Sequence, residues 1–555
     1  MSGGDGTGID GAADGGAGGG VTGADWPEGL RAAFDAYEMA LMADDVDALD
    51  ALFEPGSDTI RGDGAGLLVG HDRISAFRSS RGGVARRTIG RAEVRALAPD
   101  AVLVVAESRF DGGGRGLQTQ LWRFRDRGWR IAAAHVTGRA PALDRTIWRV
   151  VGDPLVRGAA GDPLVRGAED VAAGAADHRP LAGVRLAVKD LFAVAGHVVG
   201  AGNPRWERSA PVETATAPAV RALLDAGADI VGIARTDEFA YSIAGSNAHS
   251  GTPPNGAAPE RIPGGSTSGP ASAVATGVAD LAIGTDTGGS VRVPASYQGL
   301  WGIRTTHGAV DRTGLLPLAQ TFDTVGWLAR DPATLRAAAA TSLPAAPRSE
   351  DVAGPRTAPG FGGIDHGSLL VADQLLDAAS PATHAAFTTW LDALADRGVA
   401  VERVVLPPLD VLAETLRLVQ GAEAWRNDGA WVTAHPDALG PDIAGRFRMA
   451  ASITVEQERD ARTAMTGQRA RIRDVLGGRV LCLPTVPGPA PLRTETDAIQ
   501  EVRTATLRMT SVAGIGGLPA VSAPFLTVAG APVGVCLVGP VGSDLALIDL
   551  AASWR

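Results

Sequence analysis

The sequence predicts an α/β protein preceded by a small α+β domain, and three observations support this fold class. From about residue 181 to residue 555, short apolar runs typical of strands alternate with helical stretches, as in α/β layer proteins. Residues 26–140 instead contain two short helical patterns followed by three strand-like runs. Between them, residues 141–180 are rich in Gly, Ala and Asp and predict a linker.

Residues 1–25 are mostly Gly, Ala and Asp, which predicts a disordered Gly-rich tail and excludes a secretory signal. Apolar residues at helical spacing begin after Trp26, and a second short helix follows. A turn at Asp126–Gly128 joins the last two strand-like runs and predicts a hairpin. The helical patterns are Leu30, Phe34, Tyr37 and Leu41, then Val46, Leu49 and Leu52; the strand-like runs are 101–110, 117–125 and 129–136.

The linker contains the sequence of Gly152–Ala159, repeated at once as Gly161–Ala168. Repeat architectures need longer units and at least three copies, so we interpret this as a duplicated linker. Beyond it we expect strands at 184–188, 230–233 and 281–283 and a helix at 218–226, whose first residue, Pro218, suits a first helical turn. Residues 344–367 predict a surface loop.

Composition excludes several classes of protein. The chain of 555 residues has 51 Lys+Arg against 62 Asp+Glu, a formal charge of −11, whereas a nucleic-acid binder needs a basic face. No apolar run approaches the roughly 20 residues that span a bilayer. Cys482 and Cys536 form no zinc spacing and are expected in the core, and no HExxH occurs. We therefore expect a cytoplasmic protein without a metal or cofactor.

Lys189 is the one lysine in the sequence; every other cation among the 51 is arginine. A coding bias replaces lysine by arginine wherever a fixed positive charge suffices, but a guanidinium does not deprotonate in proteins. A position that needs a neutral amine would retain lysine, although one residue could also survive by accident. The surroundings of Lys189 have to decide between these interpretations.

Two Gly/Ser-rich phrases flank an apolar stretch at 271–283, which predicts loops held by a buried helix and strand rather than a flexible linker. The first phrase runs from Pro263 to Gly269 and the second from Gly284 to Arg292. Neither matches the GxxxxGK[ST] phosphate loop or the GxSxG nucleophile elbow. Once these two motifs are excluded, the remaining interpretation is a catalytic serine activated by a lysine base.

These phrases resemble the amidase signature family, whose members carry a Ser–cis-Ser–Lys triad. In the phrase Ala187–Phe192 the lysine is Lys189; the bridging serine of the Gly-Gly-Ser loop is Ser266, and the nucleophile that closes Gly-Thr-Asp-x-Gly-Gly-Ser is Ser290. The resemblance extends from about residue 181 to the end and includes residues 322–326 and 518–520. It implies a mixed β-sheet core covered by helices and a cis peptide bond between Gly265 and Ser266.

The chemistry of the residue types agrees with this assignment. A serine hydroxyl is a poor nucleophile until a neighbouring base takes its proton, and burial can lower the pKa of a lysine enough for it to serve. In the expected relay, neutral Lys189 accepts the proton of Ser266, which accepts that of Ser290, and Ser290 attacks an amide carbonyl to form an acyl-enzyme. Backbone N–H groups of Thr287, Gly288 and Gly289 are the expected oxyanion hole.

Some neighbouring residues have expected structural roles. Asp286 is interpreted as a hydrogen-bond acceptor that braces its loop, and Arg292 as the partner of a carboxylate; Gly265 shapes the loop before Ser266. His249 and His307 lie near the family phrases, and structural or solvated roles are favoured for both. Departures from the family pattern at Thr267, Ser268, Pro270, Gln298 and Ser250 leave the triad intact and affect the expected shape of the substrate site.

The substrate is left open between several hypotheses. Residues 202–206, 238–243, 247–249 and 291–297 resemble plant indole-3-acetamide amidases, which implies a small carboxamide such as an aryl-acetamide. Residues 118–122 and 128–136 resemble the cone-shaped α+β domains of the nuclear transport factor 2 superfamily, and more narrowly the small partner protein of amidases in cyanuric acid breakdown, which implies ureido or biuret-type amides. The amidase subunit of a tRNA-dependent amidotransferase is a third hypothesis.

The expected partners also differ between hypotheses. All of the enzyme hypotheses need a small-molecule amide and neither nucleic acid nor a membrane as a binding partner. The front domain could act in substrate chemistry or mediate only a homodimer, because this fold hosts many functions. Some amidase-like modules that have lost the catalytic serine act as docking domains in organelle import; the intact Ser290, Ser266 and Lys189 favour an enzyme.

Overall fold

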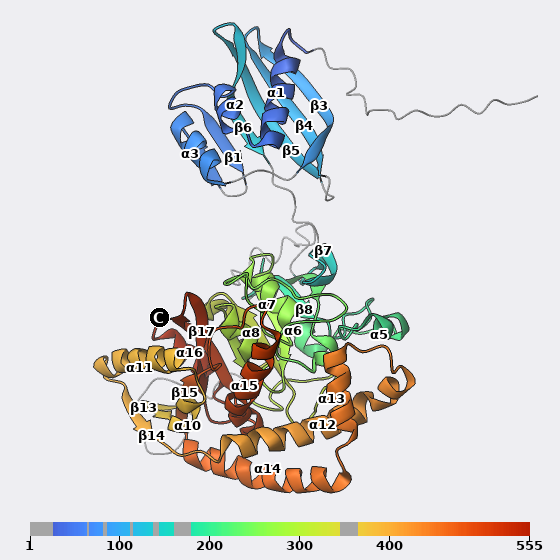
Figure 1. The fold of residues 1–555 in the computed structure, drawn as a ribbon, viewed down its shortest axis with the longest axis vertical. Helices are drawn as coiled ribbons and strands as arrows, with labels where there is room; N and C mark the ends of the chain where they lie inside the picture. The colour runs from blue at the N-terminus through green and yellow to red at the C-terminus, as the bar shows by residue number, and fades with distance from the viewer. Residues whose placement is uncertain are drawn as a thin grey trace, which may run out of the picture. The chain divides into compact units, whose positions relative to one another are not determined.

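The computed structural model describes residues 26–63, 66–81, 86–110, 115–136, 144–159, 179–343 and 364–555. The chain divides into two compact units, Met1–Leu143 and Asp144–Arg555 (Figure 1). The predicted tail, the second copy of the octapeptide and most of the predicted loop at 344–367 lie outside the described residues. No helix in these ranges is both long and apolar enough to cross a bilayer.

In the described residues of the front unit, six strands form one sheet and helices pack on it. The strand order is β2-β1-β6-β5-β4-β3, in which β1 and β6 are parallel and the other neighbours antiparallel. The elements are α1 (Leu30–Ala43), α2 (Val46–Ala51), β1 (Ile60–Asp63), β2 (Gly66–Val69), α3 (His71–Arg81), β3 (Arg87–Ala98), β4 (Ala101–Phe110), β5 (Arg115–Arg125) and β6 (Gly128–Val136).

The predicted helices and hairpin of this unit are confirmed. In Figure 1, α1 lies across the face of the sheet, and its four periodic apolar residues Leu30, Phe34, Tyr37 and Leu41 are all buried. They share a core with Trp122 of β5. β5 and β6 pair antiparallel around the expected turn. The sequence did not predict β1, β2, α3 or β3; most of β3 is exposed, so it lacks the apolar alternation of a half-buried strand.

The second unit is built on a mixed sheet, which confirms the expected fold class. Among the described residues eleven strands join in the order β14-β13-β15-β17-β16-β11-β12-β10-β8-β9-β7. The strands are β7 (Trp148–Val156), β8 (Arg185–Lys189), β9 (Asp229–Ala234), β10 (Leu281–Asp286), β11 (Trp301–Arg304), β12 (Thr324–Ala329), β13 (Asp365–Val371), β14 (Ala400–Arg403), β15 (Arg479–Pro484), β16 (Ala520–Val528) and β17 (Ala531–Val538).

Helices cover this sheet, and those between β14 and β16 also contact one another: α12 packs on α13, α14 and α15 (Figure 1). α6 begins at Pro218 as expected. The helices are α5 (Pro204–Ser209), α6 (Pro218–Asp225), the 3₁₀ turn η1 (Glu238–Ala240), α7 (Ser268–Ala275), α8 (Arg292–Tyr297), α9 (Pro332–Ala340), α10 (Asp373–Asp377), α11 (Pro381–Asp396), α12 (Leu409–Ala434), α13 (Pro441–Ala451), α14 (Val455–Leu476), α15 (Thr496–Gly516) and α16 (Asp544–Ala552).

The structure differs from the sequence-based expectation at residues 148–156, which fall inside the predicted linker but form β7. This strand pairs antiparallel with β9 at the edge of the sheet, with register shifts on both sides of its central residues. The shift between Val151 and Val156 spans the Gly152-Asp153-Pro154 part of the first octapeptide, where it is expected because proline cannot donate to a strand ladder and is tolerated at edges and bulges. The prediction of a linker at residues 148–156 is therefore wrong, because the Gly- and Pro-containing composition of this edge strand is also typical of a linker. The end of the predicted loop at 344–367 likewise begins β13.

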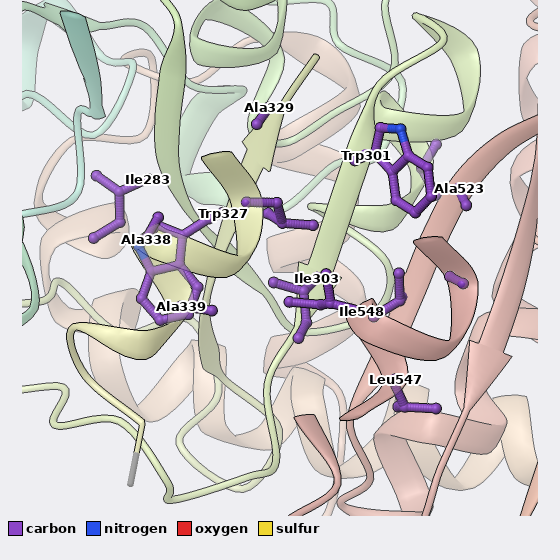
Figure 2. Close-up of a cluster of buried hydrophobic side chains, with 14 of the residues drawn as sticks. Ile283, Trp301, Ile303, Trp327, Ala329, Ala338, Ala339, Ala523, Leu547 and Ile548 are labelled. Atoms are coloured by element: carbon purple, nitrogen blue, oxygen red, sulfur yellow. The ribbon is translucent and has the colours of Figure 1, made fainter. Parts of the chain in front are cut away.

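Large apolar side chains of β11 and β12 pack at the centre of the sheet. Figure 2 shows Trp327 and Ile303 of these strands packed with residues of α9 and α16. Both side chains are fully buried. β12 lies between β11 and β10, and β10 pairs in turn with β8, so this packed centre fixes the strands that end at the candidate site.

Candidate active site

Three hydroxyl side chains converge on a lysine at the end of strand β8. Lys189 is the last residue of β8, and its Nζ lies 2.8 Å from Ser266 Oγ, 2.8 Å from Thr285 Oγ1 and 3.1 Å from Thr267 Oγ1. Thr285 is on β10, which runs parallel to β8, so the carboxyl ends of the two strands meet at the same edge. The sequence-predicted residues Lys189 and Ser266 are therefore in direct contact.

Lys189 is completely buried, and burial lowers its pKa to about 7. The carboxylates of Asp237, Asp286 and Asp323 oppose this shift, but burial outweighs them. A neutral amine has two protons and one lone pair. Its three hydroxyl neighbours can therefore be satisfied if Nζ donates to two of them and accepts from the third.

The loop that carries Ser266 is fixed by its backbone. The Gly265–Ser266 peptide bond is cis, which confirms the expectation from the resemblance. The carbonyl oxygen of Ser266 accepts hydrogen bonds from Thr236 Oγ1 at 2.9 Å and from the backbone N–H of Asp237 at 3.2 Å. A Cβ at Gly265 would lie 2.2 Å from Asp237 Oδ2, so this position requires glycine.

Ser290 lies at the end of the second Gly/Ser-rich loop, next to the first. The backbone N–H of Thr267 donates to the carbonyl of Ser290 at 3.2 Å and joins the two loops. Among the described contacts no hydrogen bond joins the hydroxyls of Ser290 and Ser266. Hydrogen bonds used in catalysis are often long in a free enzyme and tighten when substrate binds.

A buried carboxylate braces the Ser290 loop. Asp286 Oδ1 accepts the backbone N–H of Gly289 at 2.9 Å and pairs with Arg292 Nη2 at 2.9 Å and with Arg304 Nη1 at 3.1 Å, while Oδ2 accepts from Arg292 Nε at 3.0 Å. Burial alone would raise the pKa of the Asp286 carboxyl, but the two guanidiniums hold it below its usual range. The expected bracing role of Asp286 and the expected carboxylate partner of Arg292 are both present.

The carbonyl groups of the Ser290 loop accept hydrogen bonds from Arg304 and Thr510, and this sets the direction of the N–H groups in the same peptide units. The carbonyls of Asp286 and Thr287 accept from Arg304 at 2.6 and 3.3 Å, and that of Gly288 accepts from Thr510 Oγ1 at 2.7 Å. In a trans peptide the N–H points opposite to the C=O. The N–H groups of Thr287, Gly288 and Gly289 are thereby turned away from these anchors, but that of Gly289 is already engaged by Asp286.

Ser290 is one of the residues that line a small pocket. The pocket is lined partly by polar groups, which include Tyr241, Gln420 and Arg503. The lining residues are Ala240, Tyr241, Ser242, Ile243, Gly288, Ser290, Gln420, Arg503 and Leu507.

The remaining sequence-predicted residues have structural contacts. His249 Nε2 lies 2.7 Å from the buried carboxylate of Glu238, and His307 Nε2 lies 2.9 Å from the carbonyl of Gln320. Cys482 and Cys536 are buried and not joined in a disulfide, as expected for small core residues. The described residues contain no group of three or more His, Cys, Asp or Glu arranged to hold a metal ion.

Sequence reasoning missed several residues of the site. Thr285 contacts Lys189, the charge of Asp237 acts on Lys189, and Asp323 accepts a hydrogen bond from Thr287 Oγ1 at 2.6 Å. Asp323 lies in a phrase that belongs to the family resemblance, so its position was marked but its role was not. Asp237 follows β9 with no Gly/Ser-rich pattern around it, and only the fold brings it to the loop.

Comparison with known families identifies both units. A family model described as Amidase matches residues 163–548, which is more than half of the chain. The chain belongs to the amidase family. A second model, described as AtzH-like, matches residues 25–140 of the front unit. Amidase 1 of Arabidopsis thaliana is 38% identical over 411 residues, which cover 67% of this chain and 93% of the relative.

Solved structures agree with this assignment. A crystal structure of an amidase, without a stated organism, is 28% identical, has a TM-score of 0.62, and covers 74% of this chain and 91% of its own. A second structure, also without a stated organism, is described as an unexpected vestigial protein complex that reveals the evolutionary origins of an s-triazine catabolic enzyme. It is 28% identical, has a TM-score of 0.60, and covers 68% of this chain and 84% of its own. This chain is thus an amide hydrolase of the amidase signature type.

The ion cluster below the Ser290 loop yields a stability prediction. Replacing Asp286→Asn removes the charge shared by two buried arginines, so the free energy of unfolding should fall by about 3–5 kcal/mol. The matched control is Asp280→Asn, whose partners Arg185 and Arg330 are both more than 40% exposed; it should cost about 1 kcal/mol or less. Urea unfolding followed by circular dichroism measures both, and equal losses would contradict the prediction.

Proposed function

We propose that this amidase hydrolyses the C–N bond of a small carboxamide to a carboxylate and ammonia, through an acyl intermediate on Ser290. The contact between the buried Lys189 amine and Ser266 Oγ carries the proposal, because a hydroxyl relay needs an uncharged base at its end. Lys189 donates to Thr285 and Thr267 and takes the proton of Ser266, and Ser266 takes the proton of Ser290.

Ser290 Oγ then attacks the substrate carbonyl carbon, and the carbonyl oxygen becomes an oxyanion. We assign the N–H groups of Thr287 and Gly288 to this oxyanion and leave out that of Gly289, because Asp286 already accepts it. Collapse of the tetrahedral intermediate breaks the C–N bond. The relay protonates the leaving nitrogen, ammonia departs, and water activated by the same relay hydrolyses the acyl-serine ester.

Substitution of the lysine tests this mechanism. Lys189→Arg keeps a cation of similar size but cannot become neutral, so kcat/KM should fall at least about 100-fold. Arg185→Lys, an exposed position on the same strand, should keep the wild-type rate. Ammonia release is measured for both after circular dichroism shows that they are folded. Near wild-type rates in Lys189→Arg would rule out the proposed base.

The pH profile provides a second test. Because Lys189 must be neutral, kcat/KM should rise with pH, level off above an apparent pKa near 7, and fall about tenfold per unit below it. This sign is opposite to that of a reaction that needs the ammonium. A rate that stays constant from pH 5 to 9 would contradict the assignment.

The leading substrate class is a small primary amide, possible members of which include aryl-acetamides such as indole-3-acetamide. The similarity to Amidase 1 over nearly the whole length of that relative supports a stand-alone amidase. Ammonia release from indole-3-acetamide, phenylacetamide, an aliphatic amide and glutamine tests this class. Glutamine turnover that needs an added partner protein would instead support an amidotransferase subunit.

A second candidate is the hydrolysis of ureido or biuret-type amides, and the fused AtzH-like unit favours it. The similarity to the structure related to s-triazine catabolism supports the same candidate. Ammonia release from biuret and allophanate is measured with the full chain and with a shorter chain that begins at Asp144. The shorter chain keeps edge strand β7. Ureido turnover that requires the front unit would support this candidate; aryl-amide turnover by both chains would support the first.

A further inference from the structure

The pocket beside Ser290 contains a cation that the proposed mechanism does not use. Arg503 lies on α15, one turn before Leu507, and both residues line the same pocket as Ser290 and Gly288. The Nε atom of Arg503 is buried and has no hydrogen-bond partner in the described part of the chain. A buried guanidinium nitrogen without a hydrogen-bond partner costs free energy, so the presence of Arg503 in the pocket needs a reason.

A second arginine lies close enough to affect it. Arg446 of α13 is 6% exposed, and its Nη2 lies 2.7 Å from Asp442, while its Nε and Nη1 have no hydrogen-bond partner among the described residues. Burial, followed by the charge of Arg446, lowers the pKa of Arg503 to about 10; Asp442 and Tyr241 oppose this. Arg503 is therefore still positively charged at neutral pH.

The acids around these arginines leave positive charge in excess. Asp442 is the carboxylate that faces the pair, and its side chain is 53% exposed, so solvent weakens its effect. Arg417 also acts on Tyr241, but it is paired with Glu414 at the surface. Within the described part of the chain, one exposed carboxylate thus faces two arginines that each have a buried nitrogen without a hydrogen-bond partner.

We propose that Arg503, supported by Arg446, binds a carboxylate of the substrate, so that the natural substrate is a small amide that also carries a carboxylate group. The proposal rests on the proposed function, because the carboxylate must occupy the pocket while its amide carbonyl lies at Ser290. Since the group that leaves is ammonia, the carboxylate belongs to the acyl part of the molecule and remains on Ser290 in the acyl-enzyme.

The shape and chemistry of the pocket favour a carboxylate over other anions. The planar guanidinium presents paired N–H groups that match the two oxygens of a carboxylate. The pocket is small, so it can accept only a short acyl part. Tyr241, Ser242 and Gln420 add hydroxyl and amide groups to the lining, and an anion can accept from these as well.

Matched pairs of amides test the proposal. Succinamate and butyramide differ by a carboxylate in place of a methyl group, as do malonamate and propionamide. The full-length protein should hydrolyse each anionic amide with a kcat/KM at least about tenfold above that of its neutral partner. Indole-3-acetamide and allophanate are assayed alongside them.

Arg503→Gln should remove this preference by raising KM for the anionic amides at least about tenfold, while the rates for butyramide and propionamide change little. Arg503→Lys should restore part of the preference. Arg508→Gln is the matched control on the same helix, since this arginine is exposed and paired with Asp410. It should keep both the rates and the preference of the wild type.

The two proposals fail in different ways. Faster hydrolysis of neutral or aryl amides than of their anionic partners, or an equal loss of both in Arg503→Gln, would overturn the anion site and leave the amidase proposal standing. If no amide is hydrolysed, the amidase proposal fails. Succinate binding then still tests whether Arg503 binds a carboxylate. Succinate at constant ionic strength should raise the melting temperature of the wild type but not of Arg503→Gln, and an equal rise in both would refute the anion site.

Discussion

The candidate site depends on the burial of one lysine. Moving an ammonium group out of water is costly, and the protein does not offset that cost with an adjacent carboxylate. Three hydroxyl groups surround Nζ instead, and none of them carries a charge. Hydroxyls solvate a neutral amine well, because each can donate or accept. Because these neighbours carry no negative charge, they do not cancel the effect of burial on the pKa of Lys189. They still satisfy the hydrogen bonds of its amine.

The acids near the lysine are held so that they do not reverse this effect. Asp286 is the most strongly ionised of them, but Arg292 and Arg304 take up its charge. Burial raises the pKa of Asp237 and Asp323, which favours their neutral forms. A buried ion cluster is weak support for stability by itself. Its effect here is geometric, since Asp286 also holds the N–H of Gly289 and Arg304 holds the carbonyl of Thr287.

Much of this was readable in the sequence, and the exceptions have physical causes. The single lysine and the two Gly/Ser-rich loops identified the centre, because these positions tolerate few other residues. The first octapeptide was misread because an edge strand can contain glycine and proline that a central strand cannot. Spacing places the N–H of Gly289 in the expected oxyanion hole, but it does not show that Asp286 accepts a hydrogen bond from this N–H. Arg503 was not predicted because it is one of many arginines and α15 lies more than 200 residues beyond Ser290 in the chain.

Lys189 and Arg503 show why the sequence has a lysine at one position and an arginine at the other. Burial lowers both pKa values, to about 7 for Lys189 and to about 10 for Arg503. The same kind of penalty thus yields a neutral base at one position and a permanent charge at the other, because the guanidinium starts from a higher pKa. A substrate carboxylate in the pocket would by itself favour protonation of Lys189. In the proposed arrangement the charge of Arg503 neutralises that carboxylate, so the base can remain neutral while an anionic substrate is bound.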